Sequence, residues 1–127
     1  FSAGVADALR AHGYAVGVGM VPGSYCPGDY DVAIAGRKVM GISQRRTREA
    51  LMVHGSLNLH VIPEIYAYVL DRFYAAAGIE NTADPALIGS VFAERPDRAR
   101  VLPLEQAVAE RLFSAWSRLT GTSWVEG

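Results

Sequence analysis

Apolar residues alternate with small or polar residues through most of the first half of the chain. The alternation falls within residues 14–61, and its period of two predicts β-strands. The alternating apolar positions are Val16, Val18, Met20, Val32, Ile34, Leu51, Val53, Leu57, Leu59 and Val61. An alanine-rich stretch over residues 3–11 comes before them and predicts a short helix that ends near Gly13. Ala35-Gly36 predicts a tight turn between two antiparallel strands.

The second half of the chain has the spacing of helices. Pro63 suits a first helical position, and apolar residues recur at helical spacing after it until Gly78, at Ile65, Val69, Phe73 and Ala76. Residues 82–85 predict a cap and the start of a short helix through Phe92.

A third helix is predicted from near Pro103 to Gly121. Its apolar stripe consists of Leu104, Val108, Leu112, Ala115, Trp116 and Leu119. The polar residues 94–100 predict a surface connection before it. The order of these elements predicts a single α+β domain, with a small helix first, a strand block over residues 14–61 and a helical end over residues 63–121. Its helices are expected to pack on one face of a mainly antiparallel sheet.

The composition of the chain limits the classes of function that it can have. The chain has 127 residues, half of them apolar and a fifth charged, which is ordinary for one globular domain. A net charge of −1 and the lack of aromatic residues among the basic ones argue against nucleic-acid binding. No apolar run approaches a membrane span, and a single cysteine fits a reducing cytoplasm. Because the first residue is Phe1, we expect a processed or partial chain.

The single cysteine, Cys26, lies in a stretch rich in glycine and proline, residues 21–31. Such a stretch excludes regular structure and predicts a turn. An isolated cysteine is usually a small buried apolar residue. A thiol on a turn with an ammonium nearby in sequence, here Lys38, also has what covalent acyl transfer requires, because a cation favours the thiolate. The residues alone leave both interpretations open.

Basic residues gather just after this loop. Arg45, Arg46 and Arg48 follow Arg37 and Lys38, and on a strand Arg46 and Arg48 would share one face, opposite Arg45. They could attract an acidic protein partner, hold a phosphate, or form the solvated edge of a hairpin.

His54 fits either a partly buried structural histidine or a residue beside a site. No histidine or cysteine has the spacing of metal ligands, so no metal site is expected.

Three runs together resemble the lipoyl/octanoyl-transferase and lipoate-protein ligase family. They are Cys-Pro-Gly-Asp-Tyr-Asp-Val from Cys26, Gly-Arg-Lys-Val-Met-Gly-Ile-Ser-Gln-Arg-Arg from Gly36, and His-Gly-Ser-Leu from His54. The first run is similar to the cysteine-dependent octanoyl/lipoyl transferases, and the last is similar to both carrier-protein octanoyltransferases and ATP-dependent ligases. The resemblance implies a biotin/lipoate ligase-like fold and a role in protein lipoylation.

The resemblance also implies roles for single residues. Cys26 would take the acyl group as a thioester, and Lys38 would stabilise the thiolate and bind the acyl carbonyl. Gly41 would let the acyl chain pass close to the strand. Ser43, His54 and Gly55 would line the substrate site, and Arg45, Arg46 and Arg48 would contact the partner.

The implied partners are lipoyl-domain proteins, with an acyl carrier protein as a further donor. The lipoyl-domain proteins are the glycine cleavage H protein and the acyltransferase subunits of 2-oxoacid dehydrogenases. The acyl group is carried as substrate, so no cofactor is implied. Members of the family carry about as much sequence again on the N-terminal side, including an Arg-Arg-x-x-Gly-Gly element that this chain lacks. An incomplete domain is therefore expected, completed by a longer chain or a separate subunit. An ATP-dependent ligase fragment and a non-catalytic subunit that binds lipoyl domains are the alternatives.

Overall fold

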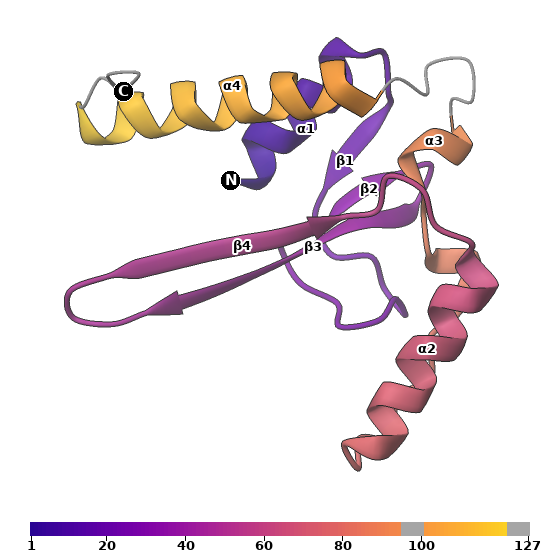
Figure 1. Cartoon of the computed structure of the whole chain (residues 1–127). Coiled ribbons are helices and arrows are strands. Elements are labelled where there is room, and N and C mark those ends of the chain that lie inside the picture. Colours follow the sequence, from indigo (N-terminus) through magenta and orange to yellow (C-terminus); the bar gives the residue numbers. More distant parts are fainter. Residues whose placement is uncertain (95–100, 122–127) are drawn as a thin grey trace.

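The structure of the chain, a computed structural model, describes residues 1–94 and 101–121. Four strands form one antiparallel sheet in the order β1-β2-β3-β4, and helices lie on both sides of it (Figure 1). The strands are β1 (Val16–Val18), β2 (Val32–Ile34), β3 (Arg37–Arg46) and β4 (Leu51–Leu57). The helices are α1 (Ser2–Ala11), α2 (Pro63–Ala76), the 3₁₀ turn η1 (Pro85–Leu87), α3 (Val91–Glu94) and α4 (Val101–Thr120). The predicted α+β class with an antiparallel sheet is confirmed.

The turn between β2 and β3 has the predicted position. Ile34 pairs with Arg37, so Ala35 and Gly36 form a two-residue loop. Both have positive φ, 50° and 75°, as a type I′ turn requires. Glycine adopts this conformation at little cost, whereas alanine at position 35 is strained.

A β-bulge in β3 decides which side chains face which way. Val32 pairs with Met40 and Ala33 with Lys38, so Val39 is an extra residue on β3. Simple alternation, without a bulge, would place Lys38 and Met40 on one face, whereas the bulge places them on opposite faces. Val39 and Met40 both enter the main core, while the Lys38 side chain runs beside Gly41 on the opposite face.

Backbone N–H groups from distant segments form hydrogen bonds with the carbonyl groups at the bulge. The Lys38 carbonyl accepts a hydrogen bond from Gly89 N at 2.8 Å, and the Val39 carbonyl accepts one from Asn58 N at 2.7 Å. Gly89 packs so closely that a Cβ there would lie 2.7 Å from Val39 Cγ1. The bulge is therefore held by the segments that flank α2 and α3.

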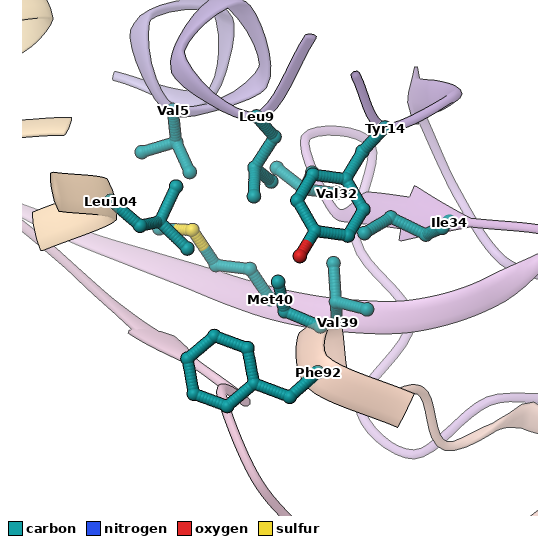
Figure 2. Close-up of a cluster of buried hydrophobic side chains, with 10 residues drawn as sticks. Val5, Leu9, Tyr14, Val32, Ile34, Val39, Met40, Phe92 and Leu104 are labelled. Carbon is teal, nitrogen blue, oxygen red and sulfur yellow. The ribbon is translucent and has the colours of Figure 1, made fainter. Parts of the chain in front are cut away.

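The main core fills the space between the sheet and the helices α1 and α4 (Figure 2). Its buried members are Val5, Leu9, Tyr14, Val32, Ile34, Val39, Met40, Val91, Phe92 and Leu104. The predicted apolar stripe of α4 is buried at Leu104 and half-buried at Val108 and Leu112, but Trp116 is half exposed. The Leu119 side chain lies outside the described residues. Helices α1 and α4 cover this face as predicted, but α2 lies on the other side of the sheet, so the expectation that the helices pack on one face alone is wrong.

Helix α2 has the predicted bounds, but its apolar stripe does not pack on the sheet. Ile65 and Phe73 are 58% and 65% exposed, and Val69 is exposed as well. The buried residues of α2 are instead Ala67 and Tyr74, on the opposite side of the helix. They form a second cluster with Tyr25, Ala83 and Ile88, on the other side of the sheet from α1 and α4 (Figure 1).

The short helix predicted through Phe92 is interrupted. Asp84 caps it as expected, since its carboxylate accepts from Ala86 N at 2.8 Å. The helical turn ends at Leu87, and Ile88 then forms a parallel bridge to Lys38 before α3 begins at Val91. Helix α4 begins two residues before the predicted Pro103. The predicted connection over residues 94–100 lies outside the described residues except Glu94, which ends α3 and pairs with Arg37.

The hairpin of β3 and β4 projects beyond the rest of the sheet (Figure 1). Strand β2 pairs with β3 only up to Met40, whereas β4 continues the pairing to Arg46. Within the described chain, the second half of β3 thus has one paired edge and one open edge. An open strand edge of this kind can pair with another strand. None of the helices within the described ranges has both the length and the apolar character needed to cross a bilayer.

We expect Ala35→Asn to stabilise the fold, because asparagine tolerates the positive φ of this turn better than alanine does. The free energy of unfolding in urea should rise by about 0.5 kcal/mol. Ala15→Asn is the control, since Ala15 is exposed and does not have a positive φ. An equal gain in both variants would contradict the turn assignment.

We also expect the isolated chain to self-associate through the exposed stripe of α2, because contiguous exposed apolar surface promotes association. Sedimentation velocity should show species larger than a monomer that increase with concentration, and Phe73→Glu should reduce them. Ala75→Glu adds the same charge at an exposed position on another side of α2 and should have less effect. A chain that stays monomeric and melts cooperatively at every concentration would contradict this prediction.

Candidate active site

The candidate site is the loop between β1 and β2, which carries Cys26. The thiol-bearing residue is exposed, and its φ of 39° lies in the left-handed region that few residues other than glycine adopt. Backbone strain of this kind persists only where surrounding contacts hold it. Two carbonyl groups in the loop, those of Tyr25 and Cys26 itself, supply such contacts.

Both carbonyls accept hydrogen bonds from Lys38. The Lys38 Nζ atom lies 2.9 Å from the Tyr25 oxygen and 2.7 Å from the Cys26 oxygen. It also lies 2.9 Å from Asp31 Oδ2. An ammonium has three N–H donors, and these three acceptors match them. Lys38 is 1% exposed and Asp31 2%, so the ion pair is almost fully removed from water.

Asp31 joins this ion pair to the rest of the loop. Its Oδ2 also accepts from Gly28 N at 3.0 Å, and its own N–H donates to the Gly28 carbonyl at 3.2 Å. The Lys38 ammonium further lies 4.6 Å from the centre of the Tyr25 ring, in cation–π geometry. The loop from Tyr25 to Asp31 is therefore wrapped around one buried cation.

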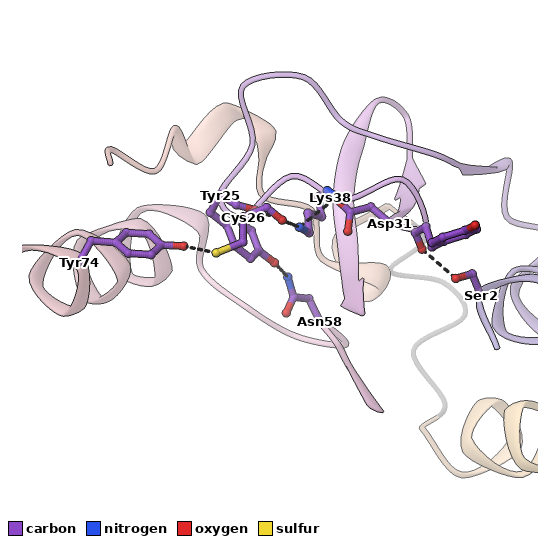
Figure 3. A network of polar contacts seen from close by, with 9 residues as sticks. Ser2, Tyr25, Cys26, Asp31, Lys38, Asn58 and Tyr74 are labelled. Carbon is purple, nitrogen blue, oxygen red and sulfur yellow. Dashed lines mark hydrogen bonds and ion pairs between the residues drawn. The ribbon is translucent and has the colours of Figure 1, made fainter. Parts of the chain in front are cut away.

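The Cys26 sulfur points away from Lys38 and toward α2 (Figure 3). Its Sγ lies 2.7 Å from the Tyr74 hydroxyl oxygen, and either atom can be the donor. Burial raises the pKa of Tyr74 to about 12, and the hydrogen bond with Cys26 adds to that rise. The Tyr74 phenol thus stays protonated at neutral pH.

Tyr25 and Asn58 complete the buried polar network. Asn58 Nδ2 donates to the Tyr25 hydroxyl and to the Gly89 carbonyl, each at 3.3 Å. Burial raises the pKa of Tyr25 well above its usual range, so this phenol is also neutral. The network therefore links the Cys26 loop to Asn58 and Gly89, whose backbone N–H groups hold the bulge.

The arrangement gives an exposed thiol on a loop whose backbone is fixed by a buried ion pair. The family model for the lipoyl protein ligase A/B catalytic domain matches residues 1–110. The chain belongs to this family.

Several relatives carry the name octanoyl-[GcvH]:protein N-octanoyltransferase. The protein from Geobacillus kaustophilus (strain HTA426) is 35% identical over 118 residues, which cover 91% of this chain and 41% of that protein. The protein from Exiguobacterium sp. (strain ATCC BAA-1283 / AT1b) is 42% identical over 105 residues, covering 80% and 38%. The protein from Exiguobacterium sibiricum is 48% identical over 63 residues, covering 50% and 23%. The chain thus spans about two fifths or less of the length of these relatives.

Four of the predicted site residues share the face of β3 and β4 that carries Lys38. They are Gly41, Ser43, Arg45 and His54. Ser43 pairs with His54, and alternation from Gly41 places both on that face. Arg45, two residues after Ser43, lies on it as well. His54 is exposed, so the partly buried position considered for it is wrong.

Gly41 has a structural reason to be glycine. A Cβ there would lie 3.2 Å from Lys38 Cε and 3.4 Å from Lys38 Nζ. The missing side chain leaves room for the lysine to reach the loop. Passage of an acyl chain beside Gly41 stays a prediction.

Gly55 and Arg46 lie on the opposite face from Lys38. A Cβ at Gly55 would overlap the Met40 methyl group and come within 3.0 Å of the Gly41 carbonyl oxygen. Gly55 therefore makes room for the core side of the hairpin rather than facing the Cys26 loop. Arg48 follows the end of β3 in the turn, so the predicted shared face of Arg46 and Arg48 is wrong. All three arginines at the hairpin tip are exposed.

Sequence reasoning gave no role to Tyr74, Asp31, Tyr25 or Asn58. Asp31 and Cys26 lie in the same short motif, which is the one signal that could have identified the aspartate. Tyr74 is 48 residues from Cys26 and has no local signal. Among the described residues, no group of three or more His, Cys, Asp and Glu side chains is placed to hold a metal ion.

We predict that Asp31→Asn lowers the free energy of unfolding by about 3 kcal/mol, because it leaves a buried ammonium without its counter-charge. Asp7→Asn is a matched control. Asp7 pairs with Arg10 at the same 2.9 Å distance but on the surface, where loss of a pair costs about 1 kcal/mol or less. Urea denaturation measures both variants. Equal effects would show that the Lys38–Asp31 pair does not organise the loop.

Proposed function

We propose that this chain carries the nucleophile of an acyltransferase in protein lipoylation. An octanoyl or lipoyl group moves through a thioester on Cys26 to a lysine of a lipoyl-domain protein. The observation that carries the proposal is the exposed Cys26 on a loop held by the buried Lys38. A buried apolar cysteine, the alternative interpretation, would have neither the exposure nor the fixed backbone.

The chemistry needs two acyl transfers. In the first, the Cys26 thiolate attacks the carbonyl carbon of the donor, a bond from sulfur to carbon forms, and the donor's leaving group departs with a proton from water. In the second, a lysine amine attacks the thioester, an amide forms, and the thiolate is expelled. The second transfer, from thioester to amide, is favourable, and with an amide-linked donor the complete exchange breaks one amide and forms another, so it needs no ATP.

In this proposal, the main role of Lys38 is to position the Cys26 nucleophile. Its three donors are engaged with two loop carbonyls and Asp31, so it orients the nucleophile through the backbone. Binding of the acyl carbonyl by Lys38, the role the resemblance implies, would require exchange of one of these partners.

The relatives' name specifies octanoyl-[GcvH] as donor and a protein nitrogen as acceptor. We propose the same donor for this chain, the glycine cleavage H protein carrying octanoate. The acceptors are other lipoyl domains, such as those of 2-oxoacid dehydrogenase acyltransferase subunits, and acyl carrier protein is a further candidate donor. The exposed Arg45, Arg46 and Arg48 would attract acidic surfaces of these partners. The acyl group is carried as substrate, so no cofactor is proposed, and the site of action is the cytoplasm.

Two alternatives differ in what they predict at Cys26. An ATP-dependent lipoate-protein ligase would activate the free acid as an adenylate and leave Cys26 unmodified. A non-catalytic subunit would bind lipoyl domains through its arginines and form no adduct.

We expect octanoyl-GcvH to add one octanoyl mass to the chain at Cys26 without ATP. The experiment uses the chain alone and the chain joined to the part of the Geobacillus relative that it does not match. Intact-protein mass spectrometry measures the adduct, and hydroxylamine should remove it, as for a thioester. Cys26→Ala should abolish the adduct, whereas Ser114→Ala, a small exposed polar position on α4, should keep it.

Three results would contradict the transferase assignment. An adduct that survives Cys26→Ala would place the acyl group elsewhere. Acylation of the acceptor only with free octanoate and ATP would favour the ligase. Binding of GcvH without any adduct in either form of the protein would favour the non-catalytic subunit.

A further inference from the structure

We propose that Tyr74 is a second catalytic residue, whose phenol donates a hydrogen bond to the Cys26 thiolate and thereby favours the nucleophilic form of the sulfur. The inference rests on the proposed function, since it assigns a role at the same sulfur. It names a residue from α2, outside the three motifs that carry the family resemblance.

The geometry of the sulfur supports this assignment. Cys26 Sγ lies 2.7 Å from the Tyr74 hydroxyl, and Figure 3 shows the phenol reaching from α2 to the sulfur. Lys38 bonds to the carbonyl of Cys26, on the other side of the residue from its thiol. Within the described part of the chain, no other hydrogen bond to this sulfur is found.

Ionisation of the thiol determines the direction of this hydrogen bond. While the sulfur carries its proton, either group can donate. Once the proton is lost, only the phenol can donate, and a hydrogen bond to the charged form stabilises that form. Because burial keeps the Tyr74 phenol protonated at neutral pH, it remains a donor when the thiolate forms.

The Tyr74 side chain is also held in position. It is 5% exposed and belongs to the cluster with Ala67, Ala83 and Ile88. Asp71, one turn earlier on α2, accepts a hydrogen bond from Ala83 N at 2.7 Å and fastens the helix to the segment that follows it. A donor fixed before the reaction stabilises developing charge without reorganisation.

The proposed hydrogen bond acts in both acyl transfers. In the first, the thiol proton goes to water, the thiolate attacks the octanoyl carbonyl carbon, the bond to the donor nitrogen breaks, and that amine takes a proton from water. In the second, the acceptor amine attacks, the carbon–sulfur bond breaks, and the amine proton goes to water. The expelled thiolate again accepts from Tyr74. The phenolic proton stays on its oxygen throughout.

The experiment measures the pH profile of Cys26 alkylation by iodoacetamide, which needs no acyl donor. Cys26 is the chain's one cysteine, so the readout is specific. Tyr74→Phe should raise the midpoint of this profile by about one pH unit, which means about tenfold less thiolate at neutral pH. This shift is at the lower end of what a hydrogen bond to a charged group contributes, as expected at an exposed site. Tyr68→Phe removes an exposed hydroxyl from the same helix and should leave the midpoint unchanged.

A second variant removes the ambiguity of a folding defect. Replacement of Tyr74 by 3-fluorotyrosine keeps the hydroxyl and makes it a stronger donor, so the midpoint should fall. Opposite shifts in the two variants, with unchanged circular dichroism, support a hydrogen bond and not a packing effect. A midpoint that stays at the wild-type value in Tyr74→Phe, or that moves in the same direction in both variants, overturns the proposal.

Acylation by octanoyl-GcvH then separates this inference from the proposed function. If the wild-type protein forms the Cys26 adduct and Tyr74→Phe forms it about tenfold more slowly at neutral pH, both stand. If the adduct forms equally fast and the midpoint is unchanged, Tyr74 is not catalytic and the transferase assignment survives. If the midpoint shifts but the wild-type protein never forms an adduct, the hydrogen bond is real, and both the transferase assignment and a catalytic role for Tyr74 are wrong.

Discussion

The buried ion pair of Lys38 and Asp31 is the constraint on which the rest of the site depends. Removal of both charges from water is costly, and the cost is offset only where every donor and acceptor is matched. Here the ammonium has three acceptors, and the carboxylate also accepts a loop N–H. The loop must therefore close around the cation in one way. That closure sets the exposed position of Cys26.

The sheet separates two kinds of surface. The face toward α1 and α4 is filled by the main core, while the face toward the Cys26 loop carries Lys38, Gly41, Ser43 and His54. The β-bulge at Val39 makes this separation possible, because it turns Lys38 away from the core while Met40 stays in it. Without the extra residue, a buried lysine would point into an apolar cluster without acceptors.

Lys38 and Tyr74 contact different parts of Cys26. Lys38 contacts the backbone of Cys26 from the sheet, and Tyr74 contacts its sulfur from α2. The loop thus depends on two elements that touch it from different directions. Helix α2 has a matching asymmetry, since the side with Tyr74 is buried and the side with Ile65 and Phe73 is exposed. The chain spans about two fifths of the length of the Geobacillus relative.

The sequence by itself determined the local structure. The helix after Pro63, the turn at Ala35-Gly36 and the irregular loop around Cys26 follow from hydrophobic period and from the φ preferences of proline and glycine, which act over a few residues. Tertiary structure decided the faces and the distant contacts. A single extra residue at Val39 reverses the alternation that places Lys38, and the sequence pattern does not reveal where such a bulge falls. The contact between Cys26 and Tyr74 spans 48 residues and depends on how α2 packs. An apolar stripe shows that a helix has two sides, but only the neighbours present in space determine which side is buried.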